Sequence, residues 1–196
     1  MSKGLIWVAA LAACCALGRV TFAEEGLRYT NPDLRKTLLE MREKDQKYRG
    51  PGKKIDYATL MALDRENQEA LKAIIARAGW PGPSAVGKDG ERAAWLVVQH
   101  ADQDREWQTS VLKLMEAGLA SGGASKDIYA YLYDRVTQPQ RYGTQGRCVA
   151  PNRWQPLDIE AVADVEARRA DVGLPRLDEY VAFMSGHCKQ ADKPAV

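Results

Sequence analysis

Apolar side chains recur along most of this chain at the three- and four-residue spacing of one face of an α-helix. No stretch shows the sustained alternation of apolar and polar residues that a strand shows, so we predict an all-α fold of six or seven helices in a single globular domain. Asn31 before Pro32 is typical of a helix start, and Gly79 is typical of a helix end. The predicted helices cover about 32–48, 57–78, 90–101, 105–119, 126–136, 158–172 and 177–188.

The third of these helices, 90–101, has apolar residues almost all round its circumference. A helix with that pattern is normally central and buried. Its last turn brings the first polar groups, Gln99, His100 and then Asp102. We therefore expect a functional site where this buried helix reaches the surface.

A long polar segment follows the fifth helix and runs to Pro156. Arginines stand in it at six-residue steps, and no acidic residue lies between its first arginine and Leu157. The four arginines are Arg135, Arg141, Arg147 and Arg153. Structureless loops of this length are uncommon in compact domains and are often functional, so we predict one long ordered loop.

The first 23 residues have the pattern of an export signal, with Lys3 followed by an apolar run from 4 to 17 and then small residues. The run is too short for a transmembrane span, which needs about 20 apolar residues. Cleavage after Ala23 is the favoured reading, and a lipoprotein anchored at Cys14 is the alternative. The predicted organisation is a signal peptide (1–23), a helical domain (31–189) and a disordered tail (190–196).

Removal of the signal changes the charge and the cysteine count. It takes away Lys3 and Arg19 and leaves 26 basic residues against 26 acidic ones, so a global electrostatic case for nucleic acid as a partner fails. It also leaves Cys148 and Cys188, for which an oxidising compartment predicts one disulfide. We expect a periplasmic or secreted protein.

His100 and Asp102 are the candidate catalytic residues. Histidine titrates near neutral pH and can act as a general acid or base, with Asp102 or Asp104 to orient its ring. The structural alternative is a histidine that only hydrogen-bonds a carbonyl at the helix end. Both interpretations stay open at this stage.

The candidate ligand-binding residues lie at the start of the long loop. Arg135 has the planar fork that clamps a carboxylate or phosphate, although pairing with an acid such as Asp102 would explain it as well. Polar side chains follow it at Gln140, Tyr142, Thr144 and Gln145. They could fix a ligand or merely satisfy the loop itself.

A metal site is not expected, because His100 with Asp102, Asp104 or Asp134 matches no known metal-ligand spacing. We predict no cofactor either, since the chain has no glycine-rich phosphate loop and no nucleophile elbow.

An ordered set of short motifs between Asp64 and Tyr180 resembles a bacterial helical family catalogued only as a domain of unknown function. The resemblance implies a mostly helical fold and no particular activity. It is carried by Gly79-Trp80-Pro81, Gln99-His100-Ala101-Asp102, Asp134-Arg135-Val136, Tyr142-Gly143-Thr144-Gln145, Arg168-Arg169-Ala170 and Gly173-Leu174.

Two functions are compatible with these observations. In the first, an exported domain binds a small anionic or polar ligand in a pocket formed by His100 and the loop residues, with hydrolysis as a further step. In the second, the loop arginines form a protein-interaction surface together with Tyr142 and Trp154. A pocket requires His100 and Gln145 to be recessed, whereas an interface requires Trp154 and several arginines to be exposed.

Overall fold

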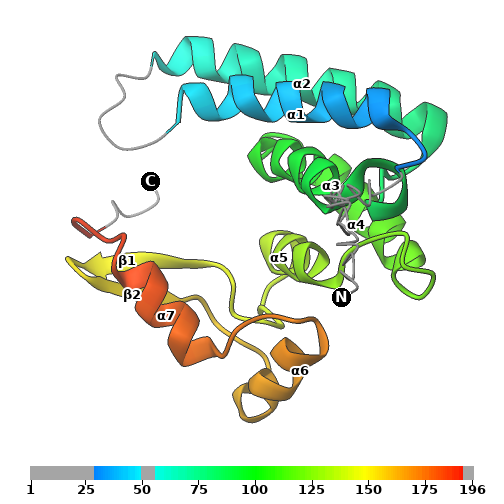
Figure 1. Ribbon diagram of the computed structural model, residues 1–196. Helices are drawn as coiled ribbons and strands as arrows, with labels where there is room; N and C mark the ends of the chain where they lie inside the picture. Colours follow the sequence, from blue (N-terminus) through cyan, green and yellow to red (C-terminus); the bar gives the residue numbers. More distant parts are fainter. Residues whose placement is uncertain (1–28, 50–55, 192–196) are drawn as a thin grey trace, which may run out of the picture.

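The computed structural model describes residues 29–49 and 56–191 (Figure 1). Within these ranges the chain forms seven α-helices and one β-hairpin, which confirms the mostly helical fold. The predicted signal peptide and the last five residues of the predicted tail lie outside the described residues.

The helices begin and end close to the residues that the capping pattern indicates. The Asn31 side chain accepts a hydrogen bond from the Leu34 amide (3.0 Å), and Asp56 and Asp104 cap the second and fourth helices in the same way. The helices are α1 (Pro32–Lys47), α2 (Tyr57–Ala78), α3 (Pro83–His100), α4 (Arg105–Leu119), α5 (Lys126–Val136), α6 (Val165–Asp171) and α7 (Leu177–Ser185).

Helix α3 lies at the centre of the larger part of the fold, as its apolar pattern predicts. It contacts α1, α2, α4 and α5, and α1 and α2 run side by side along one edge of the molecule (Figure 1). The side chains of Val86, Ala93, Ala94 and Val98 are fully buried in this core. The polar end of α3 is therefore anchored by a core that reaches into four neighbouring helices.

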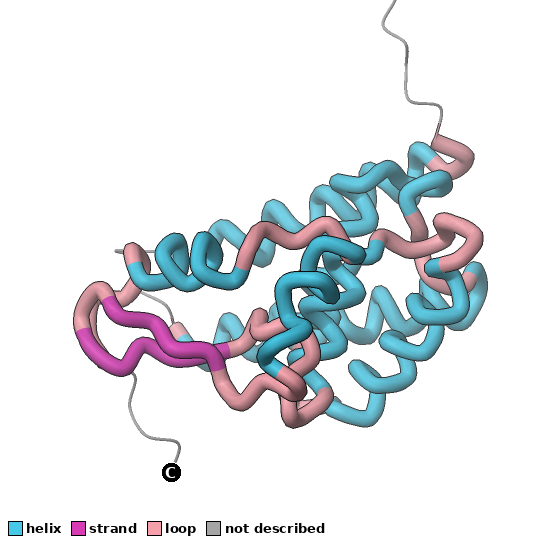
Figure 2. The backbone as a smooth tube through the Cα atoms, turned by 90° about the horizontal axis from the view of Figure 1, so that it is seen from below, coloured by secondary structure: helices cyan, strands magenta, loops and turns pink. Residues whose placement is uncertain are grey.

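A β-hairpin within the long segment corrects the expectation of a strand-free chain. Strands β1 (Gly146–Ala150) and β2 (Arg153–Pro156) pair antiparallel and lie at one end of the molecule (Figure 2). Each strand has only four or five residues, and the pairing is interrupted by a bulge in β1 after Cys148. Such short strands show too few alternations for the period of two to be recognised in the sequence.

The hairpin is fastened to α7, in a smaller part of the fold that packs on α5. The predicted disulfide between Cys148 and Cys188 is present, and it joins β1 to the segment just after α7. On the same face Trp154 packs edge-on against Tyr180, whose ring in turn contacts Tyr131 of α5. These contacts hold the hairpin and α7 together against the middle of α5.

Several helix boundaries differ from the expected ones. Helix α3 starts at Pro83 rather than at Gly90 and is interrupted at Gly87, where φ is 73°. Helix α6 is only seven residues long and follows a 3-10 turn at Val162–Asp164, whereas a helix over 158–172 was expected. Helix α7 ends at Ser185, three residues before the expected end.

Candidate functional site

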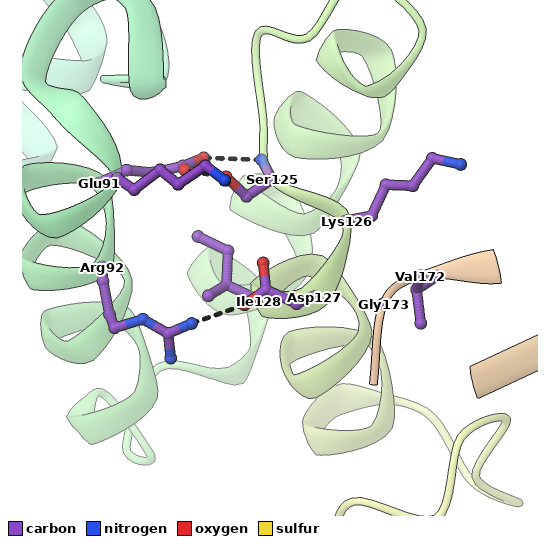
Figure 3. Close-up of a pocket in the computed structure, with 9 residues that line it drawn as sticks. Glu91, Arg92, Ser125, Lys126, Asp127, Ile128, Val172 and Gly173 are labelled. Carbon is purple, nitrogen blue, oxygen red and sulfur yellow. Dashed lines mark hydrogen bonds and ion pairs between the residues drawn. The ribbon is translucent and has the colours of Figure 1, made fainter. Parts of the chain in front are cut away.

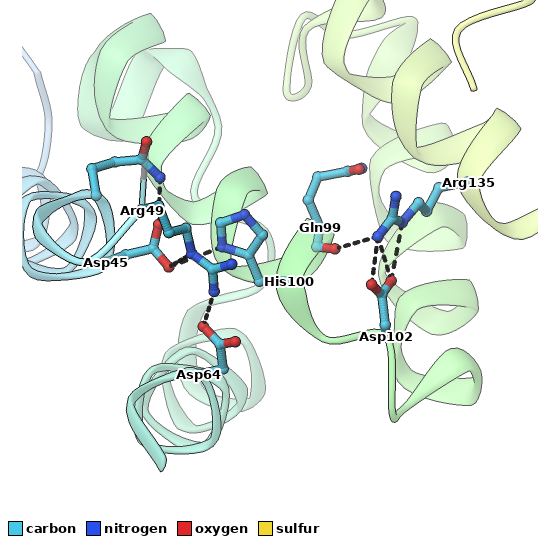
Figure 4. Close-up of polar contacts among 8 residues, drawn as sticks. Asp45, Arg49, Asp64, Gln99, His100, Asp102 and Arg135 are labelled. Atoms are coloured by element: carbon cyan, nitrogen blue, oxygen red, sulfur yellow. Dashed lines mark hydrogen bonds and ion pairs between the residues drawn. The ribbon is translucent and has the colours of Figure 1, made fainter. Parts of the chain in front are cut away.

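The polar residues at the end of α3 separate into two groups, one on each side of the helix (Figure 4). His100 turns toward Asp45 of α1, while Asp102 and the carbonyl of Gln99 face Arg135 of α5. The chain leaves the helix at Ala101 and starts α4 at Arg105, so the two groups lie only a few residues apart in sequence. They are nevertheless separate clusters with different partners.

Arg135 and Asp102 form a two-pronged ion pair. Nη2 of Arg135 lies 2.6 Å from both carboxylate oxygens of Asp102, and its Nε donates to one of them at 3.0 Å. Nη1 donates to the Gln145 side-chain oxygen at 3.2 Å. The pair is half exposed, with 30% of the Arg135 side chain and 51% of the Asp102 side chain accessible. The guanidinium is thus held in one orientation at the surface.

Asp134, the neighbour of Arg135, organises the loop that follows. Its fully buried carboxylate accepts hydrogen bonds from the amides of Arg141 (2.8 Å), Tyr142 (3.0 Å) and Thr144 (2.8 Å). The Thr144 hydroxyl donates a fourth, at 2.9 Å. Buried charge is tolerated when it is fully hydrogen-bonded, and here these loop donors satisfy it.

The side-chain amide of Gln140 holds the next part of the loop by hydrogen bonds to main-chain carbonyls. Its Nε2 donates to the carbonyls of Gln145 (2.8 Å) and Leu157 (3.0 Å), so it joins the two ends of the hairpin. Tyr142 packs among Ala130, Val172 and Tyr133. Gln140, Tyr142 and Thr144, which were predicted to bind ligand, are therefore buried in the loop, and the polar side-chain atoms of Gln140 and Thr144 bind other parts of the protein.

Buried Arg169 of α6 supports the same loop from the other side. Its Nη1 donates to the Tyr142 carbonyl at 2.6 Å and its Nε to the Pro175 carbonyl at 2.7 Å. The Arg169 guanidinium lies over the Tyr180 ring, 5.1 Å from the ring centroid. Burial lowers the pKa of Arg169, which has no carboxylate partner within ion-pair distance among the described residues.

A cavity of about 630 Å³ opens beside the Arg135–Asp102 pair; we call it the Arg135 cavity. The end of α5, the start of α4 and the base of the hairpin form its walls. Its lining residues are Asp102, Arg105, Asp134, Arg135, Val136, Gln138, Gln145, Gly146 and Leu157. Three of the predicted site residues thus come together here: Asp102, Arg135 and Gln145.

Arg105 and Gln138 line this cavity but were not predicted. Arg105 is exposed at the first position of α4, and its Nη1 donates to the main-chain carbonyl of Arg135. The sequence signal for Arg105 is weak, because a charged residue after the Asp104 cap is ordinary in a helix start.

The His100 cluster consists of His100, Asp45, Arg49 and Asp64. Nδ1 of His100 lies 2.9 Å from Oδ1 of Asp45, whereas Asp104, one of the acids expected to orient the ring, caps α4 instead. Nε of Arg49 donates to Asp45 at 3.0 Å, and its Nη2 pairs with Asp64. Only 3% of the Asp45 side chain and 21% of the His100 side chain are accessible.

These contacts shift the pKa of the Asp45 carboxyl group. Burial alone would raise the pKa of its carboxyl group, but the hydrogen bond and charge of His100, with help from Gln46 and Arg49, outweigh burial and lower it. The three potential metal-ligand atoms, one each from Asp45, Asp64 and His100, lie within 4.8 Å of one another. Asp45 and Asp64 were missed because they come from α1 and α2, far from His100 in sequence.

A second cavity, of about 400 Å³, lies where α5 begins (Figure 3). Two of its charged residues are paired within the protein: Glu91 accepts hydrogen bonds from the amide and hydroxyl of Ser125, and Arg92 pairs with Asp127 at 2.5 Å. The Glu91 carboxylate also accepts from Trp80 Nε1 at 3.0 Å. We interpret this group as a structural tie between α3 and α5.

Comparison with known proteins places the chain without supplying a function. A family model described as "Family of unknown function (DUF6624)" matches residues 32–189. No curated protein and no solved structure matches the chain. Over the described ranges, none of the helices has the length and apolar character that crossing a membrane requires.

Proposed function

The chain belongs to this family of unknown function, and we propose from its own residues that it is an exported protein that binds a small anionic or polar ligand in the Arg135 cavity. The observation that carries the proposal is that two arginines, Arg105 and Arg135, line one cavity. Its volume of about 630 Å³ lies in the range of small-molecule sites.

Arg105 is the stronger of the two candidates for direct contact with an anion. It makes one hydrogen bond, to the Arg135 carbonyl, and no ion pair within the described part of the chain. Its remaining donors are therefore available. A guanidinium offers several donors in a plane, which suits the two oxygens of a carboxylate or a phosphate.

Arg135 supplies orientation as well as charge. Asp102 and Gln145 hold its guanidinium in place, so little side-chain entropy is lost when a ligand arrives. Asp134 also lines the cavity, but its carboxylate is directed at the loop amides. Asp102 is therefore the carboxylate most exposed to a ligand, and a donor group on the ligand would complement it.

Hydrolysis receives less support than binding. His100 is not among the cavity residues and turns to the other side of α3 (Figure 4). Asp102 is the remaining candidate base, but both of its oxygens already accept hydrogen bonds from Arg135. Binding without chemistry is thus the simpler role for this cavity.

The alternative function is a non-catalytic protein-interaction module. Exposed Arg141, Arg147 and Arg153 support it. The aromatic residues proposed as its anchors do not, because Trp154 is only 5% exposed and Tyr142 only 7%. An interface formed by these residues would depend on arginines alone, so we rank this function second.

Export is a separate part of the proposal. The pattern of residues 1–23 supports it, and the disulfide between Cys148 and Cys188 is compatible with an oxidising compartment. A periplasmic or secreted protein is the favoured form, with lipid attachment at Cys14 as the alternative.

A thermal-shift screen tests the binding proposal. The purified protein is melted with dicarboxylates, sugar phosphates, nucleotides and cell-wall fragments, because a ligand that binds only the folded state raises the melting temperature. We expect a hit among the anionic compounds. Arg105→Gln should weaken its binding by about tenfold or more, as loss of a charge-assisted hydrogen bond does.

Arg147→Gln is the matched control, because Arg147 is an exposed arginine on the hairpin and does not line the cavity. It should leave the affinity of the hit unchanged. Binding that is insensitive to Arg105→Gln, or equally sensitive to both substitutions, would place the ligand elsewhere and refute the proposal. The absence of any hit from the anionic compounds would also count against it.

A further inference from the structure

The His100 cluster brings two carboxylates and an imidazole together, which is more than a single ion pair requires. Two carboxylates, of Asp45 and Asp64, converge with an imidazole, and their potential ligand atoms lie within 4.8 Å of one another. The side chain of Asp45 is 3% accessible and that of Asp64 11%. Two acids held together with so little access to water require a cation between them.

In the structure Arg49 is that cation. Its Nε bonds Asp45 at 3.0 Å, and its Nη2 bonds Asp64. One positive charge faces two negative ones, so Arg49 offsets only one of the two carboxylates. Arg49 follows the end of α1, and 24% of its side chain is accessible, so the guanidinium has a route to solvent.

We propose that Asp45, Asp64 and His100 form an exchangeable site for a divalent transition-metal ion, with Arg49 as the competing cation. The donor set selects the ion: imidazole favours zinc and its neighbours, whereas magnesium and calcium prefer oxygen alone. Three protein ligands leave a coordination position open for water, as catalytic zinc sites do and structural sites do not.

The three potential ligand atoms need to move only a little to bind one metal ion. Ligands of a tetrahedral zinc ion lie roughly 3.3–3.6 Å apart, given bond lengths of about 2.0–2.2 Å. The Asp45 and His100 atoms, 2.9 Å apart, would move slightly apart, and the widest separation in the group, at most 4.8 Å, would shorten. A side-chain shift of roughly 1 Å, together with departure of Arg49, would bring all three to a metal. In the metal-bound form Nδ1 of His100 gives up its proton and Nε2 carries the hydrogen.

Titration calorimetry with zinc, after chelator treatment of the purified protein, tests the site. We expect one zinc ion per chain. Arg49→Met removes the competitor and should tighten binding at least tenfold, while His100→Ala and Asp64→Asn should weaken it at least tenfold. Magnesium should not compete at millimolar concentration. His100→Ala keeps both ion pairs of Arg49, so it also controls for folding, which circular dichroism checks in every variant.

His187→Ala is the matched control, since His187 is the other histidine of the chain and is exposed. It should leave zinc binding unchanged. If zinc binds neither the native protein nor folded Arg49→Met, no metal site exists and the proposal fails. It also fails if His187→Ala abolishes binding while His100→Ala does not, or if Arg49→Met binds no more tightly than the native protein. None of these outcomes bears on the Arg135 cavity, whose test uses other ligands and other variants.

Discussion

At the scale of single residues, neighbours in sequence have unlike tasks in this fold. Asp134 and Arg135 are adjacent, yet the carboxylate of Asp134 is buried in the loop and the guanidinium of Arg135 lines a cavity. His100 and Asp102 are two positions apart and bind different helices. The direction of a side chain at a helix end depends on where its residue stands around the helix axis. Residues that are close in sequence therefore need not belong to the same site.

Asp134→Asn should destabilise the protein by about 3–5 kcal/mol, because it replaces a buried acceptor of four hydrogen bonds by a neutral amide whose NH₂ group opposes donors. Chemical denaturation measures the change. Asp127→Asn is the control, because Asp127 is on the same helix as Asp134 and forms a partly exposed ion pair with Arg92 of α3. This substitution should cost about 1 kcal/mol or less. Equal effects of the two substitutions would contradict the role given to Asp134.

The lowered pKa of Asp45 predicts how stability depends on pH. Because the carboxyl pKa is below its ordinary value of 3.8 in the folded protein, the unfolded chain binds the proton more readily. The ionised group thus contributes stability that is present above about pH 4 and is lost as the pH falls through the folded pKa. His100, Arg49 and Gln46 are the groups that lower it.

Urea unfolding of the native protein and of Asp45→Asn, at pH values from 7 down to 3, measures this contribution. The difference in the free energy of unfolding between the two proteins should shrink as the pH falls below about pH 4. A difference that persists unchanged to pH 3 would show that the Asp45 pKa is not lowered by folding.

At the scale of elements, the hairpin depends on its neighbours rather than on its own pairing. A two-stranded hairpin is marginal by itself in water. Here Trp154 and Cys148 face α7, and the Trp154 amide donates to the Ser185 hydroxyl at 3.0 Å. The Asn152 amide donates to the Cys188 carbonyl at 2.8 Å. The hairpin in turn supplies Gly146 and the adjoining Gln145 to the Arg135 cavity.

Loss of the disulfide should therefore loosen both the hairpin and the cavity. The cysteines are 40 positions apart, and in the chain-entropy model a loop of that size contributes roughly 4 kcal/mol. Cys148→Ala with Cys188→Ala should lower the melting temperature by an amount that calorimetry can resolve. Reducing agent should reproduce this fall in the native protein and leave the double variant unchanged. A reductant-insensitive melting temperature in the native protein would contradict this account.

At the scale of the whole molecule, two packed units meet at α5. Four helices, α1, α2, α4 and α5, surround α3 in one core, while α6, α7 and the hairpin form a smaller unit, and the Arg135 cavity lies where the two meet. Clefts between packed units are common places for ligands. The balanced charge of the chain beyond residue 23 agrees with a ligand recognised by a few directed groups rather than by a broad field.

Export predicts a defined N-terminus in the mature protein. Mass spectrometry of protein recovered from the periplasm or the medium should show a chain that begins at Glu24 and lacks the two hydrogens lost in one disulfide. A lipid-modified chain that begins at Cys14 would support the alternative instead. An intact N-terminus on a cytoplasmic protein would exclude both.

The amino-acid sequence by itself determined the helical class, most helix positions, the buried character of α3 and the pairing of two cysteines. These follow from local periodicity, capping residues and the count of thiols, none of which needs knowledge of distant neighbours. The sequence also indicated three residues that line the Arg135 cavity, because Asp102 and Arg135 are polar residues at helix ends and Gln145 belongs to the polar loop after α5.

Only the tertiary structure decided which of these residues meet. Asp45 and Asp64 reach His100 from helices 55 and 36 positions away, and Arg105 joins Arg135 across 30 positions. The hairpin likewise forms because α7 and the disulfide hold strands that are too short to be recognised locally. Contacts between distant segments depend on how helices pack, and local patterns carry no information about that packing.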